Sequence, residues 1–192
     1  MVTVGNTDVR ERILTAALHI VGTEGVPAVT NRRIATEAAV SLGSITYHFT
    51  SQSDLLRAAL TEFVAGETAR LRDLAETYRG NGLSLEDAAT LTEQVALDLA
   101  FSAERIAPFE LYIQAGRDPE LRSAAAACFA AYDELTLTIL TALGVPQPET
   151  LASTVVATIA GLQLRRLATG AGGQEISSAL LQLIGGAFML DR

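Results

Sequence analysis

The sequence predicts an all-α protein, with about nine helices along its 192 residues. Apolar residues recur every third or fourth position through most of the chain, which places them on one face of successive helices. Ser, Thr or Asp residues stand where these helices would begin, and Gly or Pro residues stand where they would end. The 49% hydrophobic content is enough to bury a core in one large or two small domains.

The N-terminal part is expected to hold a first helix, two short helices and the start of a long one. Thr30 and Ser41 can each cap a short helix, because their hydroxyl oxygens accept hydrogen bonds from free amides of the first turn. Ser51 and Asp54 form a variant of the capping box, so the long helix is expected to begin near residue 52. The first and the long helix are expected over residues 9–22 and 53–78.

The rest of the chain is expected to be helical with short breaks. The segment 80–82 is rich in glycine and ends the long helix, and Ser84 with Asp87 can cap the next one. Asp118 is a cap followed by Pro119 at the first helical position. These helices are expected over residues 84–101, 104–116, 119–143, 149–169 and 174–190.

The segment 30–56 carries the main functional signal. Two short helices joined by a tight turn are the arrangement with which many proteins place a helix in a DNA groove. Ile45 and Phe49 would face the core, and the side chains left outward on the second short helix are mostly small or hydroxylated. Such side chains let a helix approach base edges closely and form hydrogen bonds with them. The outward residues are Leu42, Gly43, Ser44, Thr46 and Tyr47.

This segment resembles the TetR family of bacterial transcription regulators. The resemblance runs from Val9 to Leu60 and rests on four short motifs, which are Ile34-Ala35, Ala38-Ala39-Val40-Ser41, Tyr47-His48-Phe49 and Leu55-Leu56.

Two positions depart from the family pattern. Ala39 stands where the family usually has a turn glycine, which suggests a turn residue in right-handed or bridge geometry. Gln52 stands where the family usually has a lysine that contacts phosphate. A neutral donor at this position would make DNA binding less dependent on salt.

The resemblance implies a helix-turn-helix DNA-binding domain over residues 1–52 and a ligand-binding and dimerisation domain over 53–192. It implies a homodimer, formed through the last two helices, that binds a palindromic double-stranded DNA operator. The expected function is ligand-responsive transcriptional repression, with release by a small-molecule inducer. From the residues alone, the apolar stripes of the last two helices could equally close the core of one chain.

The resemblance also indicates which side chains contact DNA. Ser44 and Thr46 would face bases, with Leu42 and Gly43 beside them. Arg32 would reach a guanine edge or a phosphate, or remain a solvated surface charge. Tyr47 could instead lie in the core, and His48 could instead interact with the dipole at the end of its helix. The expected phosphate contacts are Thr30, Ser41, Tyr47 and His48, and Arg33 and Gln52 complete the predicted interface.

A ligand pocket is expected in the middle of the chain, where five of the ten aromatic residues fall between positions 101 and 132. Apolar walls with a few polar groups are typical of small-molecule sites. The alternative is an ordinary aromatic core. The predicted ligand-binding residues are Phe101, Phe109, Tyr112, Phe129, Tyr132, Gln163 and Arg166.

Charge argues against a strongly basic DNA surface. The net charge is −8, and residues 1–60 hold five arginines and five acidic residues, so the acidic excess belongs to the rest of the chain. Recognition would depend on hydroxyls, backbone amides and a few arginines. The neutral N-terminal part also leaves open a helical dimer that binds a small molecule or protein partner without binding DNA. Salt-dependent DNA binding distinguishes the two functions.

Other functional classes have little support. The single Cys128 excludes an internal disulfide and is expected to be a buried small hydrophobe. Two histidines and one cysteine cannot form an ordinary structural zinc site, so we expect no metal and no cofactor. We find no catalytic motif, no signal sequence and no apolar run near the length of a membrane span, and expect a cytoplasmic protein that is not an enzyme. His19 is expected to be structural, and Arg10 and Arg12 are expected to be ordinary surface charges.

Overall fold

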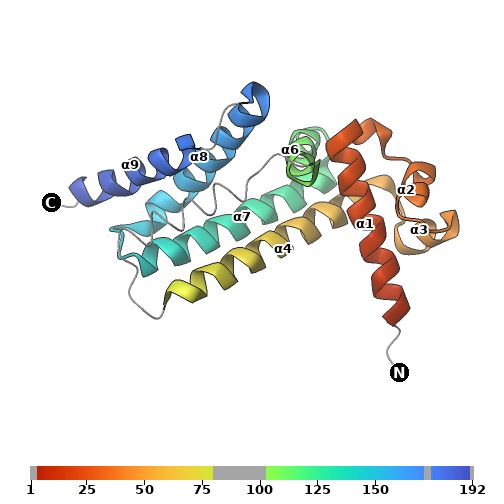
Figure 1. Cartoon of the computed structure of the whole chain (residues 1–192), viewed down its shortest axis with the longest axis horizontal. Coiled ribbons are helices and arrows are strands. Elements are labelled where there is room, and N and C mark those ends of the chain that lie inside the picture. The colour runs from red at the N-terminus through yellow and green to blue at the C-terminus, as the bar shows by residue number, and fades with distance from the viewer. Residues whose placement is uncertain (1–3, 80–102, 171–173, 191–192) are drawn as a thin grey trace. The chain divides into compact units, whose positions relative to one another are not determined.

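The computed structural model describes residues 4–79, 103–170 and 174–190, and these residues form eight α-helices and one short 3-10 helix (Figure 1). The all-α prediction is therefore confirmed. The helix expected over residues 84–101 lies outside the described residues, as does Phe101.

The chain divides into two compact units. The first comprises residues 1–65 and 101–128, and the second comprises residues 66–100 and 129–192. The long helices α4 (Gln52–Arg79) and α7 (Pro119–Ala142) each contribute to both units.

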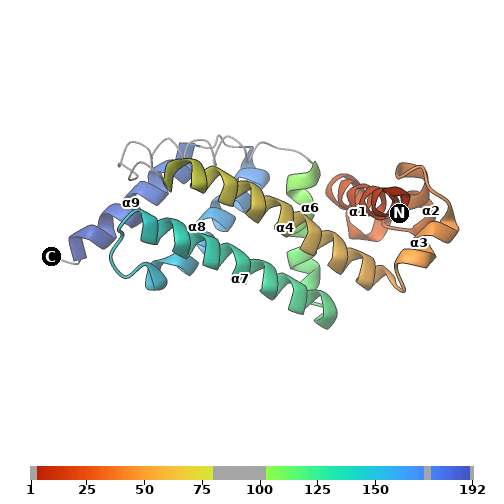
Figure 2. The ribbon, with the colours of Figure 1, turned by 90° about the horizontal axis from the view of Figure 1, so that it is seen from below.

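The first unit contains the N-terminal helices together with α6, which packs across α1 (Figures 1 and 2). α1 also contacts α2 and α3, so one helix supports both short helices. Ile13, Ile20, Ile34, Ile45 and Leu111 are almost fully buried. The helices of this unit other than α4 and α7 are α1 (Val4–Glu24), the 3-10 helix η1 (Val26–Ala28), α2 (Asn31–Glu37), α3 (Leu42–His48) and α6 (Ala103–Ala115).

The caps predicted for the helices of the N-terminal part are present. The hydroxyl of Thr30 accepts a hydrogen bond from the amide of Arg33 over 3.2 Å, and α2 begins one residue after it. Ser51 likewise accepts from the amide of Asp54 over 3.0 Å at the start of α4. The Asp54 carboxylate accepts in return from the amide of Thr50, so the capping box extends one residue further back than its usual form.

The second unit is built around the contact between α8 (Pro148–Thr169) and α9 (Gln174–Leu190). Its core includes Leu140 and Val145 from the end of α7 and the loop after it. The apolar stripes of the last two helices contribute to this core, and the dimer through these helices stays a prediction. Val155, Ile176 and Leu180 are buried there, and the residues packed against it include Leu151, Ile159, Leu162, Leu183, Ile184 and Ala187.

α7 corrects one expectation from the sequence. Its length and mean hydropathy of 1.2 over an 18-residue window are those of a helix that could cross a membrane, so the expectation that no apolar run approaches that length is too strict. Alanine, leucine and isoleucine residues together produce this hydropathy. The acidic pair Asp133-Glu134 lies in the middle of the helix, and each acid at the centre of a bilayer would cost roughly 3 kcal/mol. Buried core helices of proteins outside membranes can have the same length and mean hydropathy.

Candidate nucleic-acid interface

α3 is a short helix fixed at both ends. At its start, Ser41 accepts a hydrogen bond from the amide of Ser44 over 3.1 Å, and the two hydroxyl oxygens lie 2.8 Å apart. Ile45 is 1% exposed on its inner face, and Phe49 is 7% exposed just after its end. These contacts determine which side of α3 remains available to a partner.

The outer face of α3 carries the side chains predicted to read bases. Leu42 is 51% exposed and Tyr47 is 77% exposed, which excludes a core position for Tyr47. Thr46 is exposed and donates its hydroxyl to the carbonyl of Gly43 over 3.2 Å, which leaves the hydroxyl oxygen free to accept a hydrogen bond. Ser44 is half-buried beside Ser41.

The turn between α2 and α3 differs from the sequence expectation. Ala39 has a φ of 50°, in the left-handed region, and not the right-handed or bridge geometry expected. The amide of Val40 donates to the carbonyl of Ala35 over 3.0 Å, and the amide of Ala39 donates to that of Thr36 over 3.3 Å. This is the Schellman pattern, which requires a left-handed residue after the helix and for which glycine is the usual choice. Alanine therefore occupies a strained position here.

Arg12 is not an ordinary surface charge. It lies on α1, and its Nη2 donates hydrogen bonds to the carbonyls of both Ala38 and Ala39, the latter over 2.9 Å. The sequence reasoning missed this contact. The only local signal for the contact was Ala39 in place of the turn glycine, because an alanine there marks a turn that needs support from another part of the chain.

Arg33, predicted to contact DNA, is engaged by two carboxylates. Its Nη2 lies 2.7 Å from Glu24 and its Nη1 lies 2.6 Å from Glu37. The hydrogen bonds that Arg33 donates, to Glu24 first and to Glu37 second, raise the pKa of Arg33 above its usual value. A phosphate would have to compete with both acids for this guanidinium.

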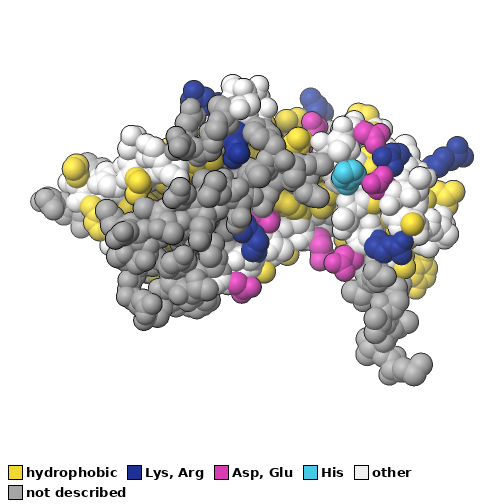
Figure 3. All heavy atoms as spheres, in the orientation of Figure 1, with side chains coloured by type: hydrophobic (Ala, Val, Ile, Leu, Met, Phe, Trp, Pro, Cys, Tyr) yellow, Lys and Arg dark blue, Asp and Glu magenta, His cyan; other side chains and the backbone are white. Residues whose placement is uncertain are grey.

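The other arginines of this part of the chain differ in availability. Arg57 pairs with Asp54 over 2.6 Å, and Arg10 lies 3.4 Å from Glu62 with its guanidinium over the ring of Phe49. Among the described side chains of residues 9–60, Arg32 is the arginine without a carboxylate or carbonyl partner, and it is exposed on α2. Figure 3 accordingly shows basic and acidic side chains interspersed over the N-terminal helices.

Gln52 and His48 also have partners within the protein. The side-chain amide of Gln52 donates to the carbonyl of Val29 over 2.7 Å, which ties the start of α4 to the segment before α2. His48 lies half-buried in the last turn of α3, with its ring edge-on to Tyr47 at 5.1 Å. This position matches the helix-dipole alternative for His48 as well as a phosphate contact. Thr30 is exposed beside the start of α2.

The predicted ligand residues are only partly brought together. Phe109 and Tyr112 contact each other edge-to-face on α6, with ring centres 6.3 Å apart, within the first unit. The others that the structure describes belong to the second unit, where they are half-buried: Phe129 and Tyr132 on α7, and Gln163 and Arg166 on α8.

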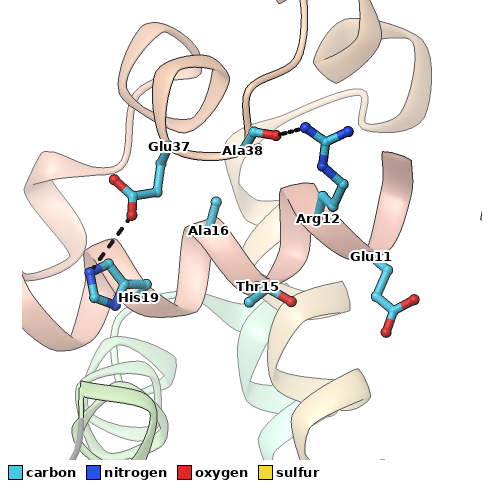
Figure 4. Close-up of a pocket in the computed structure, with 7 residues that line it drawn as sticks. All are labelled: Glu11, Arg12, Thr15, Ala16, His19, Glu37 and Ala38. Carbon is cyan, nitrogen blue, oxygen red and sulfur yellow. Dashed lines mark hydrogen bonds and ion pairs between the residues drawn. The ribbon is translucent and has the colours of Figure 1, made fainter. Parts of the chain in front are cut away.

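An open groove of about 500 Å³ lies between α1 and α2 and includes none of the predicted ligand residues (Figure 4). Its walls carry both charges. His19 approaches Glu37 to 3.7 Å across it, in agreement with the structural role expected for this histidine. The lining residues are Glu11, Arg12, Thr15, Ala16, His19, Glu37 and Ala38. The described side chains include no cluster of three or more His, Cys, Asp or Glu residues that could hold a metal ion.

Known proteins match both parts of the chain. Residues 13–59 match the bacterial regulatory proteins of the tetR family, and residues 83–186 match the tetracyclin repressor-like C-terminal domain. The HTH-type nicotine-responsive transcriptional repressor HdnoR of Paenarthrobacter nicotinovorans is 27% identical over an alignment of 161 residues, and the match covers 80% of this chain and 78% of the repressor.

Solved structures agree with these matches. A TetR-family member, SCO1917 from Streptomyces coelicolor A3, is 30% identical with a TM-score of 0.72, and the match covers 91% of this chain and 97% of that one. The multidrug binding protein EbrR in complex with ethidium is 29% identical with a TM-score of 0.72, covering 91% and 98% of the two chains. The chain thus carries the family's DNA-binding helix-turn-helix segment followed by its C-terminal domain. It belongs to the TetR family of transcriptional regulators, a family of non-enzymatic DNA-binding proteins.

Proposed function

We propose that this regulator is a cytoplasmic homodimeric repressor that binds a palindromic operator and is released by a small-molecule inducer. DNA reading is assigned to residues 1–52, and ligand binding and dimerisation to residues 53–192. The observation that carries the proposal is the outer face of α3, where Leu42, Thr46 and Tyr47 are exposed on a helix capped by Ser41 and anchored by Ile45.

The proposed interface reads bases with α3 and holds the backbone with the residues around it. Arg32 is the arginine best placed to contribute charge, because other arginines of the N-terminal part are paired within the protein. Arg33 and Gln52 would contribute only after exchanging their present partners for phosphate. The complete proposed set is Thr30, Arg32, Arg33, Ser41, Leu42, Gly43, Ser44, Thr46, Tyr47, His48 and Gln52.

Operator binding tests the interface. The DNA upstream of this gene and of its neighbours supplies candidate fragments, and binding is measured by gel shift. Thr46→Ala and Tyr47→Ala should each weaken binding about tenfold, since one good base or phosphate contact is worth roughly 1–3 kcal/mol. Thr61→Ala is the matched control, because Thr61 is an exposed threonine on α4 whose hydroxyl also bonds a carbonyl of its own helix. Unchanged binding by both α3 variants would contradict the assignment.

The proposed dimer would use the sides of α8 and α9 that the core leaves exposed. Leu164 is 49% exposed, Leu181 is 41% exposed and Met189 is 80% exposed. Exposed large apolar side chains gathered on two neighbouring helices are typical of a protein–protein interface. Gly161 and Gly185 are exposed with open space around them, which would allow two copies to approach closely.

Sedimentation measures the oligomeric state. Leu181→Asp should convert the dimer to monomer at micromolar concentration, because it places a charge in an apolar contact. Ile113→Asp is the control: Ile113 is 56% exposed on α6, away from the proposed interface residues in sequence and in the other compact unit. A Leu181→Asp protein that remains dimeric would contradict this interface.

For the inducer we propose a nitrogen-containing aromatic compound, with an aromatic cation as the first probe. The relatives support this class, since one responds to nicotine and EbrR was crystallised with ethidium and proflavin. The acidic excess of this chain lies after residue 60, which would favour a cationic ligand. The proposed contacts are Phe101, Phe109, Tyr112, Phe129, Tyr132, Gln163 and Arg166.

Ethidium fluorescence in the absence of DNA tests this class directly. Tyr132→Ala should weaken ethidium binding several-fold, because stacking of a cation on an aromatic ring is worth roughly 1 kcal/mol. Tyr47→Ala removes an exposed tyrosine from α3 and should leave ethidium binding unchanged. In a separate experiment, nicotine is added to the complex of the protein with labelled operator, and release of the operator is measured. Equal ethidium affinity in the Tyr132→Ala and wild-type proteins would remove Tyr132 from the site.

A further inference from the structure

We propose that Arg12 is a positioning residue for DNA reading. Its guanidinium holds the turn between α2 and α3 and thereby sets the orientation of α3. The inference rests on the proposed operator binding and adds a residue that belongs to neither the base contacts nor the phosphate contacts.

Arg12 reaches the turn from another helix. It lies on α1, 26 residues before Ala38, and its Nη2 donates to the carbonyl of Ala38 (Figure 4). The same Nη2 also donates to the carbonyl of Ala39. Carbonyls at the end of a helix lack partners within the helix and carry partial negative charge. A guanidinium is therefore well suited to this end of α2.

The turn needs such support because of Ala39. A φ of 50° at this residue is what the Schellman pattern requires, and an alanine side chain disfavours it. The hydrogen bond from Val40 to Ala35 forms only in this conformation. Two carbonyls held by one cation oppose the tendency of Ala39 to leave the left-handed region.

The orientation of α3 depends on this turn. Ser41 caps α3 two residues after Ala39, and the helix begins at Leu42. A change in the backbone angles of Ala39 would rotate α3 as a whole. Thr46 and Tyr47 would then leave the positions that they occupy in the native fold. Loss of Arg12 should therefore weaken DNA binding even though its hydrogen bonds are made to the protein.

Salt dependence distinguishes positioning from a phosphate contact. Arg12→Gln should weaken operator binding about tenfold at fixed salt, since charged hydrogen bonds are among the stronger ones. The slope of log K against log salt should stay that of the wild type, whereas loss of one phosphate contact from each protomer would reduce its magnitude by about 1.8 for the proposed dimer. Arg72→Gln removes the same charge from an exposed position on α4 and should change neither quantity. All measurements are made well below the melting temperature of each variant.

A second substitution tests whether the strain at Ala39 is what Arg12 opposes. Glycine adopts the left-handed conformation without strain, so Ala39→Gly in the Arg12→Gln protein should restore most of the lost affinity. Amide hydrogen exchange at Val40, measured without DNA, should accelerate in Arg12→Gln and slow again in the double variant.

The outcomes are distinct. Full-affinity binding by Arg12→Gln, a reduced salt slope, or no rescue by Ala39→Gly would each overturn the positioning role while leaving the proposed function intact. A wild-type protein that binds none of the candidate fragments would overturn the proposed function, and the inference with it.

Discussion

The hydroxyl of Ser53 donates a hydrogen bond to Oδ2 of Asp118 over 2.7 Å, joining the first turn of α4 to the residue that caps α7. The other carboxylate oxygen accepts from the amides of Glu120 and Leu121, at 3.0 and 3.2 Å. The bond to Ser53, followed by the bond from Leu121, lowers the pKa of Asp118 below its usual value. All of these residues belong to the first compact unit.

This arrangement predicts a pH-dependent contribution of Asp118 to stability. Because its pKa is lower in the folded than in the unfolded chain, the contribution is complete above the unfolded value of about 3.9 and is lost as the pH falls through the folded value. Asp118→Asn should therefore lower the melting temperature at pH 7, and the difference from the wild type should shrink as the pH falls below 4. Thermal unfolding between pH 7 and pH 2.5 measures it.

The control for Asp118 is Glu134→Gln, which neutralises an exposed acid in the middle of the same helix. Its melting temperature should follow that of the wild type across the range. A constant difference between Asp118→Asn and the wild type down to pH 2.5 would show that the effect is steric rather than electrostatic.

Ala39→Gly is expected to stabilise the protein. The left-handed conformation costs alanine roughly 1–2 kcal/mol, and the greater freedom of unfolded glycine returns part of this, so a gain of about 0.5–1 kcal/mol remains. Urea unfolding measures the change. Ala38→Gly is the matched control, because Ala38 has a right-handed φ of −77° and is buried, and glycine there should destabilise. A loss of stability in Ala39→Gly would mean that the turn is not strained.

The sequence predicted those features of the fold that depend on nearby residues. The caps at Thr30, Ser41 and Ser51 and most of the helix ends follow from periodicity and from the chemistry of the first turn, which act within a few positions. The start of the first helix was wrong, because α1 begins at Val4 and was expected from residue 9. The outward face of α3 followed in the same way from the inward positions of Ile45 and Phe49. Local signals of this kind are therefore sufficient to identify α3 and its outward face.

The contacts that hold this helix in place could not be predicted in the same way. Arg12 bonds Ala39 across 27 residues, and Gln52 bonds Val29 across 23. Such pairs depend on how helices pack, and a single sequence contains no periodic signal for them. The α8 and α9 stripes show the same limit, because apolar periodicity identifies a buried face without saying whether the same chain or a second copy covers it.

Cys128 is expected to be chemically inert in the folded protein. It is 4% exposed, in agreement with the buried small hydrophobe predicted from the sequence, and burial raises the pKa of its thiol to about 11. Very little thiolate, the reactive form, would then exist at pH 8. A chromogenic disulfide reagent should label the native protein only on the time scale of unfolding and should label it at once in denaturant. Rapid labelling under native conditions would contradict this burial.

The packing of α6 in the first unit predicts a large difference between two neighbouring side chains. Leu111 is fully buried, whereas Ile113, two residues further along the same helix, is 56% exposed. Leu111→Ala should cost about 2–5 kcal/mol, because it removes buried apolar atoms and leaves a cavity in a packed core. Ile113→Ala should change stability by about 0.5 kcal/mol or less. Urea unfolding of the two variants measures this difference, and similar losses in both would mean that α6 does not pack through the face that contains Leu111.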